Sequence, residues 1–352
     1  MTDIFGKRLL NARKEAGLSQ DQLVVRIQGY VKKTSIAKYE RGETIPDPAC
    51  VEVLAKALGK DPEYFFRPVT LQIKEVDFKS TYLPGERRLK QLSQQATSYI
   101  ERYLELLHIS GTRHITEITY ADTIIGTLAD ATEAAAMLRK KWELGSWPVH
   151  SVVHMLESKG IIMIDLPDQD DIAAISLMAA SLYKVIMFNS NHPQDELRVK
   201  LMKELSLLLF TFPEELQKSE KEKLSAHFAV NMLLPVESLT TMLGNHRSRI
   251  SLKEILLLSH KYGLPAEQAI KITFHNQLIT RYTYLKLMEH MTTPIEGWSA
   301  GSFTPGHEVP LHIGMLLIRS ETEKQISNEK ARELFPDSPA YYLPKPVTWK
   351  KV

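Results

Sequence analysis

The sequence predicts an α+β protein that is mainly α-helical and carries a small β-sheet. Apolar residues recur at helical spacing over residues 1–67 and again over residues 85–109. Three short apolar runs follow between residues 161 and 189, and helical spacing then returns. The chain has 352 residues, which suits two or three domains.

Composition and charge are those of a globular protein. Hydrophobic residues make up 43% of the chain and the net charge is only +2, so any nucleic-acid surface must be local. The single cysteine, Cys50, cannot form an intrachain disulfide, which fits a reducing compartment. The charged first residues lack the apolar core of a signal peptide, and the longest apolar runs are too short to cross a bilayer. We therefore expect a cytoplasmic protein that has no membrane partner.

Residues 1–67 predict a compact all-helical domain. Gly17 should end a first helix, Ser19 should cap a second, and the segment GYVKK should form the turn to a third. A fourth helix follows the loop RGETIPDP and ends at Gly59. The apolar faces of these helices comprise Phe5, Leu9, Ala12, Ala16, Leu23, Val24, Ile27, Ile36, Tyr39, Val51, Leu54, Ala55 and Leu58.

Two short helices joined by a tight turn within such a domain predict a helix-turn-helix. The third helix concentrates positive charge and short polar side chains, which are the types that contact phosphates and base edges. These residues are Lys32, Lys33, Thr34, Ser35 and Lys38. A small helical domain with a solvated basic face is the alternative.

The segment GLSQDQLVVRI, followed by TSIAKYERGETIP, resembles the XRE or lambda-repressor-like family of helix-turn-helix domains. The turn QGYVKK is about two residues longer than is usual in that family. The resemblance covers about 65 residues, and the matching positions are Leu18, Ser19, Gln20, Leu23, Ile36, Tyr39, Glu40, Arg41 and Gly42.

The resemblance implies a set of DNA contacts. Gln20 would face a phosphate at a helix N-terminus, and Lys38 and Arg41 would hold the backbone. The residues in the major groove would be Lys32, Lys33, Thr34 and Ser35. The implied partner is double-stranded DNA with an inverted-repeat operator, which requires a homodimer.

Residues 68–110 are expected to form a linker and one long helix. Leu71, Ile73, Val76 and Phe78 alternate with polar residues, as in a short extended strand. The segment GERRLKQLSQQATSYIERYLELLHI then predicts an amphipathic helix. Its apolar stripe could pack against the following domain or form a dimer contact, and comprises Leu89, Leu92, Ala96, Ile100, Tyr103, Leu104 and Leu107.

Residues 111–292 predict helices, a small sheet and further helices. The expected strands lie in GIIMIDL, AAISLMA and YKVIMFN. His150 and His154 stand four residues apart, which could place both on one helix face toward a metal, or they could be surface or half-buried histidines.

After these strands, SNHPQDELRVKLMKELSLLLF and SEKEKLSAHFAVNMLLP resemble the two central helices of the ImmA/IrrE family of metallopeptidase-like domains. GNHRSRISLKEILLLSHKYGLPAEQAI looks like the region that follows this domain in proteins fused to an XRE module. The resemblance implies a zincin-like fold, and the matching residues are Arg198, Glu204, Leu205, Leu208, Leu209, Phe228, Ala229, Leu234 and Pro235.

The zinc motif of that family is degenerate in this chain. A HExxH helix points two histidines at one zinc ion, and its glutamate activates the bound water. Lys203 and Leu207 stand at the two histidine positions, and Glu204 is the remaining motif residue. The third ligand position falls near Glu222 or Leu224. We therefore expect no catalytic residue, no metal and no cofactor.

Two roles are open for Glu204. It could be an ordinary solvent-facing carboxylate or one paired with Lys203 or Lys200. The domain could also have kept its cleft and changed its task, so that it binds a small molecule, a peptide or a partner protein.

Residues 293–352 form a C-terminal extension without a catalytic signature. It contains the apolar run LHIGMLLIRS, a predicted helix in NEKARELF and a tail rich in Pro, Tyr and Lys. We expect a sequence-specific DNA-binding transcription regulator, a repressor, with an inactive peptidase-like domain. The alternatives are an active zinc peptidase that cleaves a repressor and an antitoxin-type regulator that neutralises a partner protein.

Overall fold

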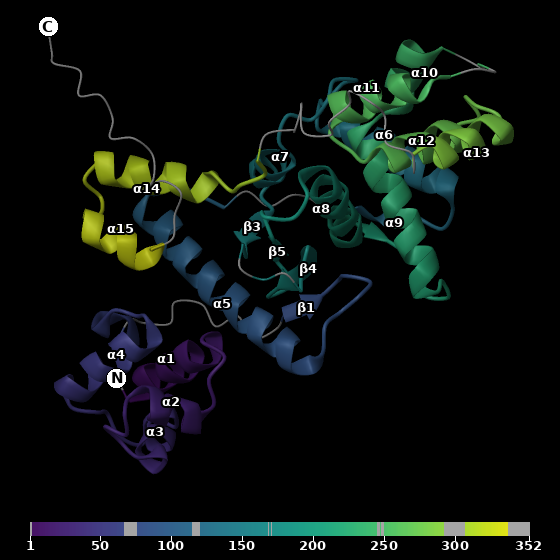
Figure 1. Ribbon diagram of the computed structural model, residues 1–352. Coiled ribbons are helices and arrows are strands. Elements are labelled where there is room, and N and C mark those ends of the chain that lie inside the picture. Colours follow the sequence, from purple (N-terminus) through teal and green to yellow (C-terminus); the bar gives the residue numbers. More distant parts are fainter. Residues whose placement is uncertain are drawn as a thin grey trace, which may run out of the picture. The chain divides into compact units, whose positions relative to one another are not determined.

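The computed structural model describes residues 2–66, 76–114, 120–167, 169, 171–244, 247, 250–291 and 307–336. They divide into two compact units, which Figure 1 shows in one view. The first unit lies within residues 1–76, 84–114 and 311–352, and the second within 77–83 and 115–310. In these described residues helices dominate and the strands form one four-stranded and one two-stranded sheet, so the predicted α+β class is confirmed.

The first unit begins with the four helices that the sequence predicts. They are α1 (Thr2–Glu15), α2 (Gln20–Arg26), α3 (Lys33–Glu40) and α4 (Pro48–Leu58), followed by the 3-10 helix η1 (Pro62–Phe66). The caps have simple causes: Asp47 accepts from the Cys50 backbone N–H at 2.8 Å, and Gly59 ends α4 with a φ of 63°. Phe5, Leu9, Leu23, Ile36, Leu54 and Phe65 form a core with no exposed surface.

Gly6 lets α1 approach the end of α3 closely. A Cβ atom at this position would lie 2.5 Å from the Tyr39 carbonyl oxygen and 2.8 Å from that of Glu40. Both are backbone atoms, which cannot move aside as a flexible side chain could. The absence of a side chain at Gly6 therefore permits the close approach of these two helices.

The long helix α5 (Glu86–Ile109) belongs to the first unit. It packs on α1 and on α14 (His312–Thr322), and α15 (Asn328–Leu334) follows α14. A buried ion pair of 2.6 Å joins Arg8 on α1 to Glu101 on α5. The predicted helices α5 and α15 are confirmed, and the apolar run of the C-terminal extension forms the helix α14. Most of the predicted stripe of α5 is buried, whereas Leu89 and Leu104 are half-buried.

The second unit contains a mixed sheet with the strand order β1-β4-β5-β3. The three predicted strands are present as β3 (Ile162–Asp165), β4 (Ala174–Ala179) and β5 (Tyr183–Phe188). β4 pairs antiparallel and β3 parallel with β5. Only Val76 and Phe78 of the predicted linker strand lie in the described residues; they flank Asp77 in β1 (Val76–Phe78), whereas Leu71 and Ile73 lie outside them.

Most of the remaining described residues of the second unit form helices. They are α6 (Leu128–Lys141), α7 (Val152–Ser158), α8 (Gln194–Leu209), α9 (Lys218–Leu233), α10 (Val236–Leu243), α11 (Leu252–Tyr262), α12 (Ala266–His275) and α13 (Arg281–His290). Two short strands, β2 (Tyr120–Ile124) and β6 (Phe210–Thr211), pair in parallel. α8 lies centrally because it packs on α9, β4, β5 and α7, and most of its side chains are buried. The motif residues predicted on α8 are therefore next to both the sheet and α9.

Candidate nucleic-acid interface and the Glu204 region

The start of α3 presents a polar and cationic surface. Lys32 is the N-cap residue of α3, and Lys33 and Thr34 form its first turn; all three are exposed. Ser35 is half-buried, and Lys38 and Arg41 are exposed further along the helix and at its end. The opposite face of α3 holds Ile36 in the core. This arrangement places the predicted groove residues together on one end of a rigid helix.

A buried network around Glu40 joins the three helices of the motif. Arg13 on α1 donates from Nε and Nη2 to the two carboxylate oxygens of Glu40, at 2.5 and 2.9 Å. Arg13 also donates to the Leu18 carbonyl oxygen at 2.8 Å, and Gln20 on α2 donates to Glu40 at 2.8 Å. A bidentate arginine–carboxylate pair fixes orientation as well as distance. The network thus fixes α2 and α3 relative to α1.

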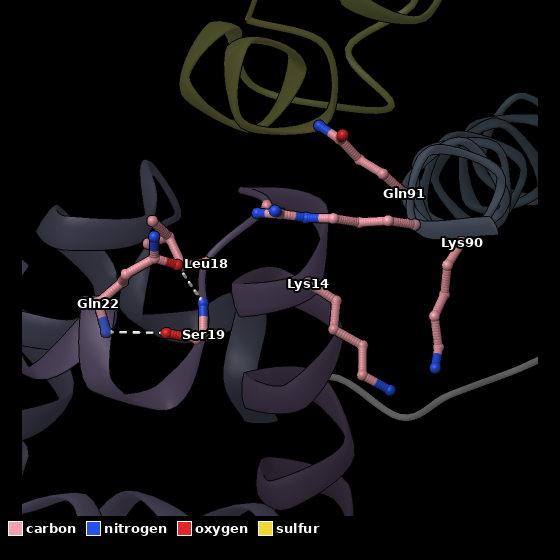
Figure 2. Close-up of a pocket in the computed structure, with 8 residues that line it drawn as sticks. Lys14, Leu18, Ser19, Gln22, Lys90 and Gln91 are labelled. Carbon is pink, nitrogen blue, oxygen red and sulfur yellow. Dashed lines mark hydrogen bonds between the residues drawn. The ribbon is translucent and has the colours of Figure 1, made fainter. Parts of the chain in front are cut away.

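Gln20 is half-buried at the start of α2, and its amide nitrogen is engaged by Glu40. The start of α2 is held by a capping box: the Gln22 backbone N–H donates to the Ser19 hydroxyl, and the Ser19 backbone N–H donates to the Gln22 side chain (Figure 2). The predicted cap at Ser19 is confirmed.

Two cations of the predicted interface have acidic neighbours. Lys33 pairs with Asp21 at 2.7 Å and Arg41 pairs with Glu43 at 2.5 Å. The side chains of the first pair are 55% and 69% exposed, and such a pair contributes only about 0–1 kcal/mol. A phosphate could therefore replace Asp21 as the partner of Lys33 at little cost.

Glu204 is buried, with 8% of its surface exposed. Its Oε2 atom accepts three hydrogen bonds: from the Ser80 hydroxyl at 2.5 Å, from the Ser176 hydroxyl at 2.6 Å and from the Ser176 backbone N–H at 3.0 Å. Ser176 belongs to β4, and Ser80 follows β1. The carboxylate is thus directed at the sheet.

Of the two alternatives for Glu204, the solvent-facing or lysine-paired carboxylate is therefore wrong. Lys200 instead contacts the His192 ring at 3.0 Å. Burial raises the pKa of the Glu204 carboxyl, while hydrogen bonds from Ser176 and Ser80 and the positive charge of Lys203 oppose that shift. Sequence spacing could not show this because Ser80 lies 124 residues away along the chain.

Lys203, at the first histidine position of the motif, forms an ion pair with Glu222 on α9. Their side chains are 17% and 31% exposed. Leu207 is half-buried one turn further along α8. The structure therefore brings together two of the four motif residues, Lys203 and Glu222, while Glu204 faces the sheet.

The paired histidines do not share a helix face. α7 begins at Val152, so His150 precedes the helix, and the His154 ring lies 3.1 Å from the Val309 carbonyl oxygen. Among the described residues, no group of three or more His, Cys, Asp or Glu side chains has the arrangement of a metal site. His227 lies next to Thr132 and His275, and burial lowers its pKa to about 4. His227 is thus neutral near neutral pH.

The comparisons with known proteins identify one part of the chain. Residues 9–65 match the helix-turn-helix family. Searches among curated proteins and among solved structures gave no match. In the part of the chain that the structure describes, no helix is both long and apolar enough to cross a membrane.

Proposed function

We propose that this protein is a sequence-specific transcription regulator, a repressor, that binds an inverted-repeat operator as a homodimer in the cytoplasm. Residues 9–65 are a helix-turn-helix domain, the type of domain that binds DNA in transcription regulators. The observation that carries the proposal is the exposed start of α3, where Lys32, Lys33 and Thr34 stand together. Lysine and threonine side chains can reach phosphates and base edges in the major groove.

The rigidity of the motif supports the same proposal. Specific recognition requires that base-contacting side chains are held within a fraction of an ångström of their positions. The Arg13–Glu40 pair and the contact of Gln20 with Glu40 fix α3 against α1 and α2.

For the second unit we propose a peptidase-like domain without catalytic activity, which binds a small molecule, a peptide or a protein partner. The Lys203–Glu222 ion pair supports this proposal. A catalytic zinc site normally has three protein ligands, whereas here an ammonium group occupies one motif position and a leucine another. The carboxylate of Glu204 is also engaged by Ser80 and Ser176.

Selection of DNA fragments by the full-length protein tests the first proposal. We expect enrichment of one sequence with two similar half-sites in inverted orientation. The absence of any enriched sequence would contradict specific DNA binding, and enrichment of single half-sites would contradict the dimer.

Elemental analysis of the same protein sample tests the second proposal. We expect no stoichiometric zinc and no cleavage of a casein substrate after zinc is added. A zinc-dependent peptidase activity that is lost in a Glu204→Gln variant would show that the domain is an enzyme.

A further inference from the structure

A pocket with three cationic side chains lies beside the helix-turn-helix. It has a volume of about 570 Å³, and all of its lining residues belong to the first unit. Lys14 comes from α1, Gln22 from α2, and Arg87, Lys90 and Gln91 from α5. Figure 2 shows Lys14 and Lys90 extending from their two helices on the same side of the pocket. Among the side chains that the structure describes, none of those that line the pocket is an Asp or Glu.

The cations influence one another across this pocket. The pKa of Lys14 is lowered first by burial and then by the positive charges of Lys90 and Arg13. Glu40 opposes this shift as the smallest of the four causes, and its carboxylate is already engaged by Arg13 and Gln20. The fold thus holds like charges together, with no carboxylate among the described side chains that line the pocket.

The amide side chains of the pocket are oriented as donors. Arg88 donates to the Gln91 amide oxygen at 3.0 Å, and the Ser19 backbone N–H donates to the Gln22 amide oxygen at 2.7 Å. These contacts use the acceptor atoms of both amides. The Gln91 nitrogen lies 3.6 Å from the position that a Cβ atom of Gly17 would occupy, and is thus close to the turn between α1 and α2. Lysine, arginine and amide N–H groups together suit a ligand that only accepts hydrogen bonds.

The helix α5 is held in place against α1. The ion pair between Arg8 and Glu101 is nearly inaccessible, with side chains 8% and 10% exposed. Arg87 and Lys90 are themselves exposed, so a ligand can reach them from solvent. The pocket therefore combines a fixed backbone with accessible cationic ends.

We infer that this pocket binds a backbone phosphate of DNA beside the major-groove site, which adds Arg87 and Lys90 to the DNA interface. The inference rests on the proposed DNA binding. The position of the pocket favours DNA as the ligand. Asp21, next to Gln22 of the pocket, contacts Lys33 at the start of α3. A duplex that receives α3 in its major groove carries rows of phosphates on both sides of that groove. Both added cations lie outside residues 9–65.

Salt dependence of DNA binding by the full-length protein tests the inference. The variant is Arg87→Ala/Lys90→Ala, and Lys90→Ala alone is a milder version. The control is Lys56→Ala/Arg113→Ala, which removes one lysine and one arginine from exposed positions of the same unit outside the pocket. Fluorescence anisotropy would measure the affinity of each protein for the selected operator and for unrelated DNA at salt concentrations from about 50 to 300 mM.

We expect the slope of log affinity against log salt to become shallower by about 1 for each phosphate that the variant no longer neutralises. Affinity should fall by the same factor for operator and unrelated DNA, because phosphate contacts carry no sequence information. The control should keep the wild-type slope. Equal slopes in wild type, variant and control would overturn the inference and leave the proposed function standing. A wild-type protein that binds no DNA would refute both.

A free phosphate compound could bind the same pocket in place of a DNA phosphate. Pyrophosphate would therefore be added to the wild-type protein, the pocket variant and the control without DNA, and the Tm would be measured. We expect no difference between the three proteins. If pyrophosphate raises the Tm of wild type and control but not of the pocket variant, and the salt slopes are equal, the pocket binds a free anion and the DNA assignment is wrong.

Discussion

Lys203 on α8 forms an ion pair with Glu222 on α9. In the proposed relationship to zinc-binding helices, these residues hold the positions of the first histidine and of one candidate for the third ligand. At the two positions where a zinc enzyme would have metal ligands, this chain thus has a lysine and a glutamate that pair with each other. This ion pair joins α8 to α9 without a zinc ion.

Restoring the two histidines should restore metal binding if α8 derives from a zinc helix. The Lys203→His/Leu207→His variant then places two imidazoles four residues apart, with Glu222 available as a third ligand. We expect one zinc per chain in this variant by elemental analysis. Leu207→His alone should bind none, because the Lys203 ammonium remains. Adding Glu222→Ala to the double variant should weaken binding, and a double variant without zinc would contradict the proposed relationship.

The Arg13–Glu40 pair should be important for the stability of the helix-turn-helix. The two side chains are only 10% and 6% exposed, so Arg13→Ala leaves a nearly buried carboxylate without its main partner. We expect a loss of about 3 kcal/mol in the free energy of unfolding of this domain, measured by urea denaturation. Lys33→Ala is the comparison, because it breaks an exposed pair and should cost less than about 1 kcal/mol. Equal losses would show that the buried pair has no special role.

Gly6→Ala should destabilise the same domain more than Gly85→Ala. A methyl group at Gly6 meets the Tyr39 and Glu40 carbonyl oxygens, whereas one at Gly85 meets no atom within 4 Å. Overpacking of this kind costs about 1–3 kcal/mol. Thermal unfolding followed by circular dichroism would compare the two variants, and a Gly6→Ala protein as stable as Gly85→Ala would contradict the close helix approach.

Glu204 should make stability depend on pH in a defined direction. Its pKa is raised in the folded state, so the stabilising contribution of the protonated form is complete below the unfolded pKa. That contribution is lost as the pH rises through the raised folded pKa. The Tm of Glu204→Gln relative to that of wild type should therefore increase as the pH rises above the ordinary carboxyl range.

Glu254 provides a control with the opposite sign. Its pKa is lowered, chiefly by the Ser251 backbone N–H and by Arg247. Its contribution is present above the unfolded pKa and is lost as the pH falls through the folded pKa. Glu254→Gln should therefore lose stability relative to wild type as the pH rises. The same trend in both variants would contradict the buried environment of Glu204.

The helix-turn-helix was predictable because its signals are local. Ser19 and Gly59 cap helices through bonds to residues a few positions away, and apolar periodicity identifies the buried faces. The strands β3, β4 and β5 were predictable for the same reason. These features depend on neighbouring residues, which the sequence shows directly.

The environment of Glu204 was not predictable, because it depends on contacts between distant segments. Ser80 reaches the carboxylate only because β1 pairs beside β4. The pocket of Lys14, Arg87 and Lys90 likewise requires α5 to pack on α1. The basic start of α5, GERRLK, was visible in the sequence, but nothing local connects it to the helix-turn-helix.

Comparison of the DNA footprints of wild type and a Lys33→Ala/Thr34→Ala variant tests directly whether α3 is the helix that reads DNA. Both residues lie in the exposed first turn of α3 and take no part in the core. We expect binding to weaken by about 1–3 kcal/mol for each base that the variant no longer reaches, with a weaker preference for the operator over unrelated DNA. The Lys56→Ala/Arg113→Ala control should retain the wild-type footprint. An unchanged footprint and affinity in the Lys33→Ala/Thr34→Ala variant would contradict the assignment of α3 as the helix that reads DNA.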